Sequence, residues 1–157
     1  MKAPQAILVA LAAAVTLTTG AAAGPDAAKQ RVAITTQAAQ PTKVSAFVLT
    51  PLQAGRLKPD SGKLTGSVPP ERIVMRDGQK VSIYDGSATL KGKLGGLVIR
   101  YRDEYVEAGN GYHVGTGTWK VVRGTGQYAG VTGAGRSAQV GGPSTWVARY
   151  QGFLTSP

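Results

Sequence analysis

The sequence predicts an all-β protein: a small closed antiparallel β-barrel of about eight strands, with little or no helix beyond its N-terminal segment. Two observations favour this fold. Short runs of β-branched and aromatic residues recur along the chain, bounded by its 22 glycines and 9 prolines, and no stretch of about 12 residues carries the apolar stripe of a helix. With 157 residues the chain has room for one domain, and a small sheet best avoids exposed edges by closing on itself.

Residues 1–23 are predicted to be a secretory signal peptide. Lys2 gives a basic start, Ala6–Leu17 an apolar run, and Ala21–Ala23 the small residues that signal peptidase accepts. The apolar run has 12 residues, whereas a membrane-spanning helix needs about 20. We therefore expect cleavage near Ala23, a secreted or cell-envelope protein, and no transmembrane segment.

Residues 24–42 are small and polar and are predicted to be a loose leader, with room for a short strand at Val32–Thr35. The barrel domain is predicted to span residues 43–157. Its first strand is Lys43–Pro51, a β-branched and aromatic run that ends at a proline.

Residues 52–76 contain many glycines and prolines, which predicts a connection with a short strand at Lys63–Val68. Three glycine-bounded strands are predicted next, at Val81–Asp85, Ser87–Leu90 and Leu97–Arg102. In the last of these, apolar and basic residues alternate, so one face is buried and the other is in water.

Asn110-Gly111 has the residues that a tight primed turn prefers, because both central positions of a type I′ turn need positive φ. This turn is predicted to join a strand ending near Glu107 to a strand at Tyr112–Arg123. Another strand begins at Gln139, and the last is Thr145–Leu154.

The charge pattern indicates a solvated basic surface. The chain has 18 basic and 8 acidic residues and a net charge of +10, but the basic residues are scattered and no aromatic series lies among them to stack bases. We expect no specific nucleic-acid site, while loose attachment to acidic cell-wall polymers or anionic lipids stays open. Without cysteine, neither disulfides nor a thiolate metal site can form.

Motifs for common enzyme classes are missing. His113 is the one histidine, so it has no second histidine for a metal or a relay, and a surface position is the more common role for such a residue. No serine lies in a Gly-x-Ser-x-Gly elbow. The glycines at 124, 126 and 130 do not have the dinucleotide-binding spacing. We expect no metal and no cofactor.

The most distinctive stretch is Gly115–Gly135, in which a glycine precedes Trp119 and, nine residues on, another precedes Tyr128. This stretch resembles the signature of bacterial secreted proteins related to the allene oxide cyclase and dirigent barrels. Phe47–Pro51 and Asp77–Val81 fall where that pattern has strands.

The resemblance implies an eight-stranded antiparallel barrel with an apolar cavity, assembled as a dimer or trimer. In the plant cyclases the cavity guides ring closure of an unstable fatty-acid epoxide, through its shape and a buried carboxylate. No residue here aligns with that carboxylate, so the activity does not transfer with the fold.

Asp103 is a candidate catalytic residue. If the strand from Leu97 continues, Asp103 follows Tyr101 on the inward face with Tyr105 beyond it, and burial would raise its pKa to suit a general acid or base. Alternatively, the strand has ended and the acidic residues pair with Arg100 and Arg102 in solvent. The second arrangement is favoured, because carboxylates are seldom fully buried.

Asp85 is a second candidate, although its Asp-Gly pair is itself a turn signal. Arg149 has two possible positions. It points into the barrel and pairs with Asp85 or Asp103, or else Trp146 and Tyr150 form the core and Arg149 lies on the surface, which is the more common arrangement.

The expected function is a non-catalytic module that binds a small hydrophobic ligand or serves as a structural surface protein. One alternative is a cofactor-independent isomerase or cyclase for a lipid-like or polyketide-like substrate, which would use Asp103 or Asp85. Another is a cationic adhesive protein of the cell envelope. The residues expected to contact a ligand are Ile99, Tyr101, Tyr105 and Arg149.

Overall fold

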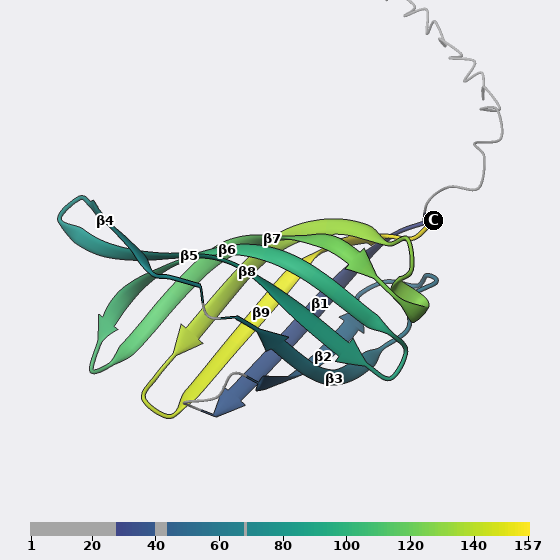
Figure 1. The fold of residues 1–157 in the computed structure, drawn as a ribbon, viewed down its shortest axis with the longest axis horizontal. Helices are drawn as coiled ribbons and strands as arrows, with labels where there is room; N and C mark the ends of the chain where they lie inside the picture. Colours follow the sequence, from purple (N-terminus) through teal and green to yellow (C-terminus); the bar gives the residue numbers. More distant parts are fainter. Residues whose placement is uncertain (1–27, 40–43, 68) are drawn as a thin grey trace, which may run out of the picture.

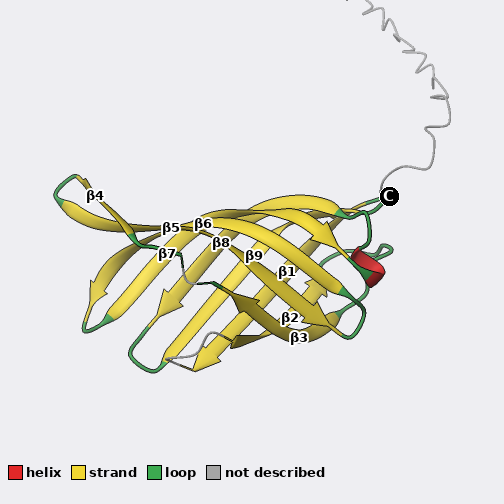
Figure 2. Ribbon diagram, in the orientation of Figure 1, coloured by secondary structure: helices red, strands yellow, loops and turns green. Residues whose placement is uncertain are grey.

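A computed structural model describes residues 28–39, 44–67 and 69–157, and the predicted signal peptide lies outside these ranges. The described chain forms one antiparallel sheet of nine strands and a short 3₁₀ turn (Figures 1 and 2). The elements are β1 Lys29–Ala39, β2 Val44–Pro51, β3 Asp60–Gly66, β4 Arg72–Arg76, β5 Gln79–Gly92, β6 Gly96–Gly109, β7 Tyr112–Gly124, η1 Gly126–Tyr128, β8 Thr132–Gly141 and β9 Thr145–Thr155.

The sheet closes on itself. Its strand order is β3-β2-β1-β9-β8-β7-β6-β5-β4, and β3 also pairs with β5, so all strands except β4 form a ring. The two ends of β5 have different partners. Its C-terminal part, Ala88–Gly92, pairs with β3, while Gln79–Ile83 pairs with β4. The β4–β5 hairpin therefore extends beyond the ring (Figure 1), and the predicted all-β barrel of about eight strands is confirmed.

The N-terminal boundary of the barrel was predicted wrongly. Residues 29–39 are not a loose leader with a four-residue strand but the whole of β1, which pairs with β2 on one side and β9 on the other. Val32 and Ile34 point inward and are fully buried. The segment looked loose because small residues such as Ala38 face inward farther along the strand, where Trp146 of β9 is the paired residue.

The later strands are longer than predicted. Val81–Asp85 and Ser87–Leu90 belong to the continuous strand β5, and the predicted strand Leu97–Arg102 and the strand predicted to end near Glu107 are both parts of β6. The predicted turn is confirmed, because Asn110 and Gly111 have φ of 54° and 73°. β6 continues through its charged residues because its backbone pairs with β5 on one side and β7 on the other.

One end of the barrel is filled by its own side chains. The glycine-rich stretch brings Trp119 and Tyr128 into this core, where they are 2% and 1% exposed. The Tyr128 hydroxyl donates a hydrogen bond to Oδ2 of Asp60 over 3.0 Å. The same carboxylate accepts the backbone N–H groups of Ser61 and Lys93. This end is therefore closed, and any site for a ligand lies toward the other end.

Candidate functional site

The open end of the barrel contains a cavity of about 410 Å³. Every strand of the ring except β3 gives it at least one aromatic, imidazole, amide, hydroxyl or acidic side chain, and β3 lines it with Leu64 and Gly66. Its lining consists of Thr36, Ala38, Ser45, Leu64, Gly66, Ser67, Pro69, Glu71, Ser82, Tyr84, Ala88, Tyr101, Asp103, Tyr105, His113, Gln139, Trp146 and Tyr150.

Asp103 is the buried acidic side chain of this cavity. It is 2% exposed, and its Oδ1 accepts a hydrogen bond from the Ser137 hydroxyl over 2.8 Å. The Tyr105 hydroxyl lies 3.5 Å from the other oxygen, Oδ2, and donates to Oε1 of Gln139 over 2.5 Å. Among the described residues, the Gln139 Nε2 atom is buried without a hydrogen-bond partner. Four polar side chains from β6 and β8 thus form one connected group.

Glycines on β7 make room for this group between β6 and β8. Gly117 pairs with Asp103 on one side and Ser137 on the other, and Gly115 pairs with Tyr105 and Gln139. A Cβ at Gly117 would collide with Asp103 Oδ1, and a Cβ at Gly115 would collide with the Tyr105 ring. Because neither residue has a side chain, Asp103 and Tyr105 lie across the inner face of β7.

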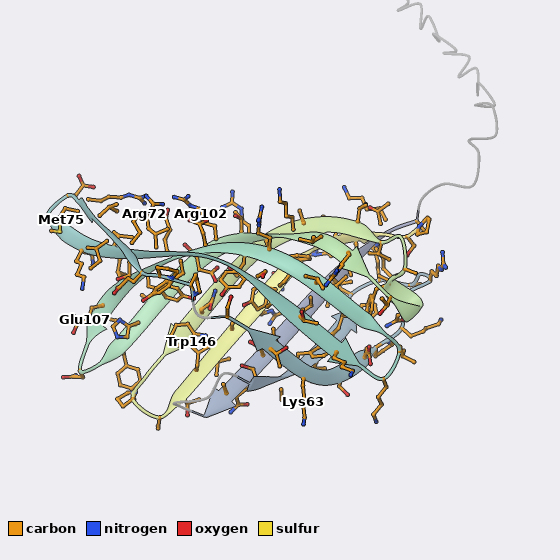
Figure 3. The ribbon with its side chains drawn as sticks, viewed as in Figure 1. Lys63, Arg72, Met75, Arg102, Glu107 and Trp146 are labelled. Atoms are coloured by element: carbon orange, nitrogen blue, oxygen red, sulfur yellow. The ribbon has the colours of Figure 1, made fainter. Side chains whose placement is uncertain are left out.

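Aromatic rings form much of the remaining wall. Tyr105 packs edge-on against Tyr84 at 5.6 Å between ring centroids and lies 5.2 Å from Trp146. Tyr101 and Tyr150 complete a set of five aromatic side chains around the space. Figure 3 shows Trp146 within the ring of strands, whereas Arg72 and Arg102 lie on the outer side.

Burial governs the protonation of these groups. Desolvation raises the pKa of Asp103 above its ordinary value, and the hydrogen bonds from Ser137 and Tyr105 only partly offset this effect. Desolvation, reinforced by the nearby Asp103 carboxylate, also raises the pKa of Tyr105 and Tyr150. The tyrosines therefore keep their protons, while Asp103 is the inner group whose charge can change.

The mouth of the cavity carries a second carboxylate. The Ser82 hydroxyl donates to Oε1 of Glu71, and this bond holds the Glu71 pKa below its usual value. His113 also lines the cavity and is itself exposed, so it occupies the surface position that the sequence favoured and faces the cavity as well. Within the described lining, Glu71, Asp103 and His113 are the ionisable side chains besides the tyrosines, and none is lysine or arginine.

The structure brings together three of the predicted site residues, Tyr101, Asp103 and Tyr105. For Asp103 the favoured solvent-exposed arrangement was wrong, because β6 continues and turns this residue inward. Ile99 is on the same face but is fully buried in the core below the cavity.

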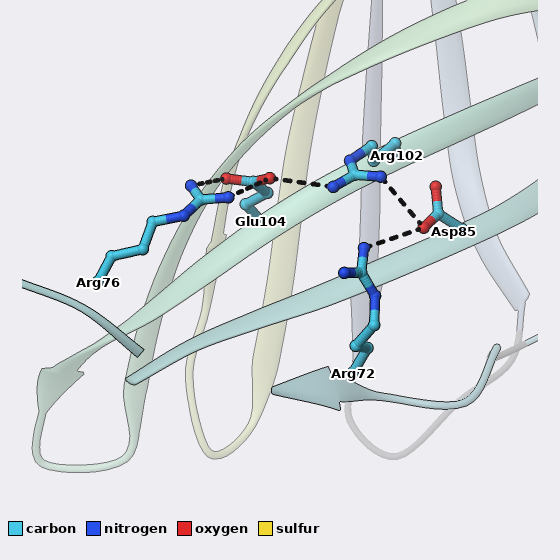
Figure 4. A network of polar contacts seen from close by, with 5 residues as sticks. All are labelled: Arg72, Arg76, Asp85, Arg102 and Glu104. Carbon is cyan, nitrogen blue, oxygen red and sulfur yellow. Dashed lines mark hydrogen bonds and ion pairs between the residues drawn. The ribbon is translucent and has the colours of Figure 1, made fainter. Parts of the chain in front are cut away.

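Asp85 and Arg149 lie outside the cavity. Asp85 is on the outer face, 3.6 Å from Arg102 and 3.8 Å from Arg72, in a surface network of ion pairs (Figure 4). Arg149 is exposed while Tyr150 is buried, so the arrangement with Arg149 on the surface is the one found. Arg149 therefore pairs with neither Asp85 nor Asp103.

Sequence reasoning missed Glu71, Ser82 and Tyr84. In β5 the apolar residue Val81 suggested the inner face, yet it faces outward, where it pairs with valines of β4 and β6 and is 6% exposed. The alternation of Ser82 and Tyr84 was the available signal for a polar inner face. Glu71 precedes β4, which forms only the hairpin beyond the ring and had no clear pattern.

Comparisons with known proteins do not assign the chain to a family. No family model matches the chain, and no curated protein sequence matches it. In the part of the chain that the structure describes, no group of three His, Asp or Glu side chains is placed to hold a metal ion. No helix in this part is long and apolar enough to span a membrane.

Asp103 is expected to make stability depend on pH. Its folded-state pKa is raised, so the folded state binds more protons than the unfolded state, and this contribution to stability falls as pH rises above the unfolded pKa of about 3.9. Asp103→Asn removes the contribution and keeps an acceptor for Ser137. The free energy of unfolding of the variant, relative to that of the wild type, should therefore increase between about pH 3 and pH 8. The increase should be about 1.4 kcal/mol for each unit by which folding raises the Asp103 pKa.

Urea unfolding at several pH values measures this difference. Asp85→Asn is the matched control, because it removes a carboxylate from the exposed outer face. A stability difference between Asp103→Asn and wild type that does not change with pH would show that Asp103 titrates normally.

Proposed function

We propose that the chain is a secreted barrel that binds a small, largely apolar molecule in the cavity of its open end. A volume of about 410 Å³ lies within the roughly 300–1,000 Å³ of pockets that enclose small ligands. Five aromatic side chains offer apolar contact, and a few polar groups at the inner end can orient a ligand. Secretion is inferred from the N-terminal sequence pattern.

One observation carries this proposal: the barrel is filled at one end and left open at the other. A barrel of about eight strands is just wide enough for its side chains to fill or to hold one small ligand. The closed end contains bulky residues such as Trp119, Tyr128 and Leu97. Toward the open end, the Tyr105 and Asp103 side chains lie over Gly115 and Gly117 of β7, and a cavity lies beside them.

Native mass spectrometry of the protein beginning at residue 24, with and without organic extraction, tests the proposal. We expect an extractable mass of a few hundred daltons, consistent with the pocket size. Ser45→Trp, on the inner face of β2, should abolish this mass because the indole fills the cavity, whereas Ala46→Trp, on the exposed outer face, should retain it. Retention of the same mass in both variants would place the molecule elsewhere, and a wild type that is always empty would contradict the proposal.

The same spectra test the dimer or trimer and the relation to the allene oxide cyclase and dirigent barrels. That relation is part of our proposal, and the ring of strands around a cavity supports it. A monomer at all concentrations would count against the assembly but not against ligand binding.

A second candidate function is a cofactor-independent isomerase or cyclase. The observation that favours it is Asp103, a carboxyl group with a raised pKa that lines an aromatic cavity. A carboxyl group in such surroundings suits proton transfer to or from a bound substrate near neutral pH. Once the extracted molecule is known, conversion of a precursor by wild type but not by Asp103→Asn would support catalysis.

A further inference from the structure

We propose that the cavity selects an organic cation, an apolar or aromatic body with a tertiary or quaternary ammonium group. This inference rests on the proposed function, because it specifies the class of ligand that the same cavity takes. Three features of the described residues point to it: the distribution of basic side chains, the aromatic wall and the position of the two carboxylates.

Basic side chains are plentiful in the chain but do not line the cavity. The sequence has 18 lysines and arginines against 8 acidic residues, yet the described lining contains Asp103 and Glu71 and no lysine or arginine. Lys63, Arg72 and Arg102 point away from the interior (Figure 3). The described lining therefore has two acidic side chains and no lysine or arginine, although the chain as a whole carries a net positive charge. A carboxylate ligand would meet the two acidic groups there without a lysine or arginine in the lining to pair with.

The aromatic wall suits a cation that is weakly hydrated. A positive charge is attracted to the electron-rich faces of tyrosine and tryptophan, and sets of such rings bind quaternary ammonium groups. Tyr84, Tyr105 and Trp146 form a consecutive series, with ring planes at 72° and 58° to each other. Because neighbouring rings are inclined to each other rather than stacked face to face, they do not fully cover each other's faces, and all three line the cavity. An ammonium group in that space can contact more than one ring.

The two carboxylates of the lining differ in depth, because Glu71 is exposed and Asp103 is buried. Glu71 at the mouth is exposed and hydrogen-bonded to Ser82, which holds it ionised. Asp103 is buried, and among the described residues its hydrogen-bond partners are the Ser137 and Tyr105 hydroxyls, with no basic side chain paired to it. An ammonium group near Asp103 would supply the missing positive charge in surroundings that water screens poorly. An uncharged ligand of the same shape gains nothing from either carboxylate.

Three probes of similar shape and different charge test this inference. Benzyltrimethylammonium and neopentylbenzene differ only in a charged nitrogen in place of a carbon, and benzylsulfonate has a similar shape with a negative charge. Binding of each to the whole protein is measured by ligand-observed NMR at pH 8. We expect benzyltrimethylammonium to bind at least about tenfold more tightly than neopentylbenzene, as a desolvated cation–π and carboxylate site would give, and benzylsulfonate not to bind.

Variants separate the inference from the proposed function. Asp103→Asn should lower the affinity for benzyltrimethylammonium by about tenfold or more and leave neopentylbenzene unchanged. Asp85→Asn removes the same charge from the outer face and should change neither affinity. If neopentylbenzene or benzylsulfonate binds as well as the cation, the selection of cations is wrong while ligand binding stands. If none of the three binds, the inference fails, and the cargo measurement on Ser45→Trp decides the proposed function separately.

Discussion

A protein that begins at Lys43 is expected not to fold, whereas one that begins at Ala28 is expected to fold fully. The shorter protein lacks β1, which pairs with β2 and β9 along its length. Its loss opens the ring and leaves β2 and β9 with unpaired edges, which costs backbone hydrogen bonds and invites aggregation. It also removes the buried side chains of Val32 and Ile34, each worth about 1.5–3 kcal/mol of burial. Added to the lost pairing, this equals much of the roughly 5–15 kcal/mol that stabilises a typical domain.

Circular dichroism and the dispersion of amide signals in NMR spectra measure the outcome. The protein beginning at Ala28 should unfold cooperatively with a dispersed spectrum, and the protein beginning at Lys43 should show neither property. A synthetic peptide of residues 28–39 should restore folding to the shorter protein by adding the missing strand. A cooperatively folded protein without β1 would show that this strand is an accessory to the barrel.

Much of the barrel was predictable because strand signals are local. The alternation at Leu97, Ile99 and Tyr101 and the turn at Asn110-Gly111 are visible in the residues themselves, and both were confirmed. β1 was not predictable in this way. Its Ala, Gln and Lys residues have little strand preference, and it forms because neighbours from distant parts of the chain pair with it on both sides.

The candidate site was harder to predict, because it depends on the register between strands far apart in sequence. Asp103 is satisfied by Ser137 and is given its space by Gly117, on two other strands. No local pattern shows that a carboxylate in a charged run has such partners, so exposure was the reasonable interpretation. Tyr84 was missed because its apolar neighbours Val81 and Ile83 suggested that the other face of β5 points inward. These two residues face outward and are buried where β5 pairs with β4.

Gly117→Ala is expected to lower the free energy of unfolding by about 3 kcal/mol or more, the upper range for an overpacked core position. A Cβ at this position would collide with the Asp103 carboxylate, with the Arg102 carbonyl oxygen and with Ser137 Oγ. The carbonyl belongs to the paired backbone of β6, so rotation of a flexible side chain cannot relieve the collision. The carboxylate would also be pushed off its Ser137 hydrogen bond, which leaves a buried polar group without a partner.

Urea unfolding of Gly117→Ala beside Gly96→Ala measures this effect. Gly96 also lies in a strand, but the nearest atom to its added Cβ is the Thr125 hydroxyl oxygen at 3.1 Å, and we expect a change within about 1 kcal/mol there. The loss at Gly117 should shrink in the double variant with Asp103→Ala, because one of the three colliding groups is then gone and no buried carboxylate remains. Equal losses with and without Asp103 would mean that the glycine serves only the close approach of the β6 and β7 backbones. A coupling between the two substitutions would instead mean that this glycine on β7 is what allows a carboxylate to lie inside the barrel, the condition on which proton transfer by Asp103 and the selection of a cation both depend.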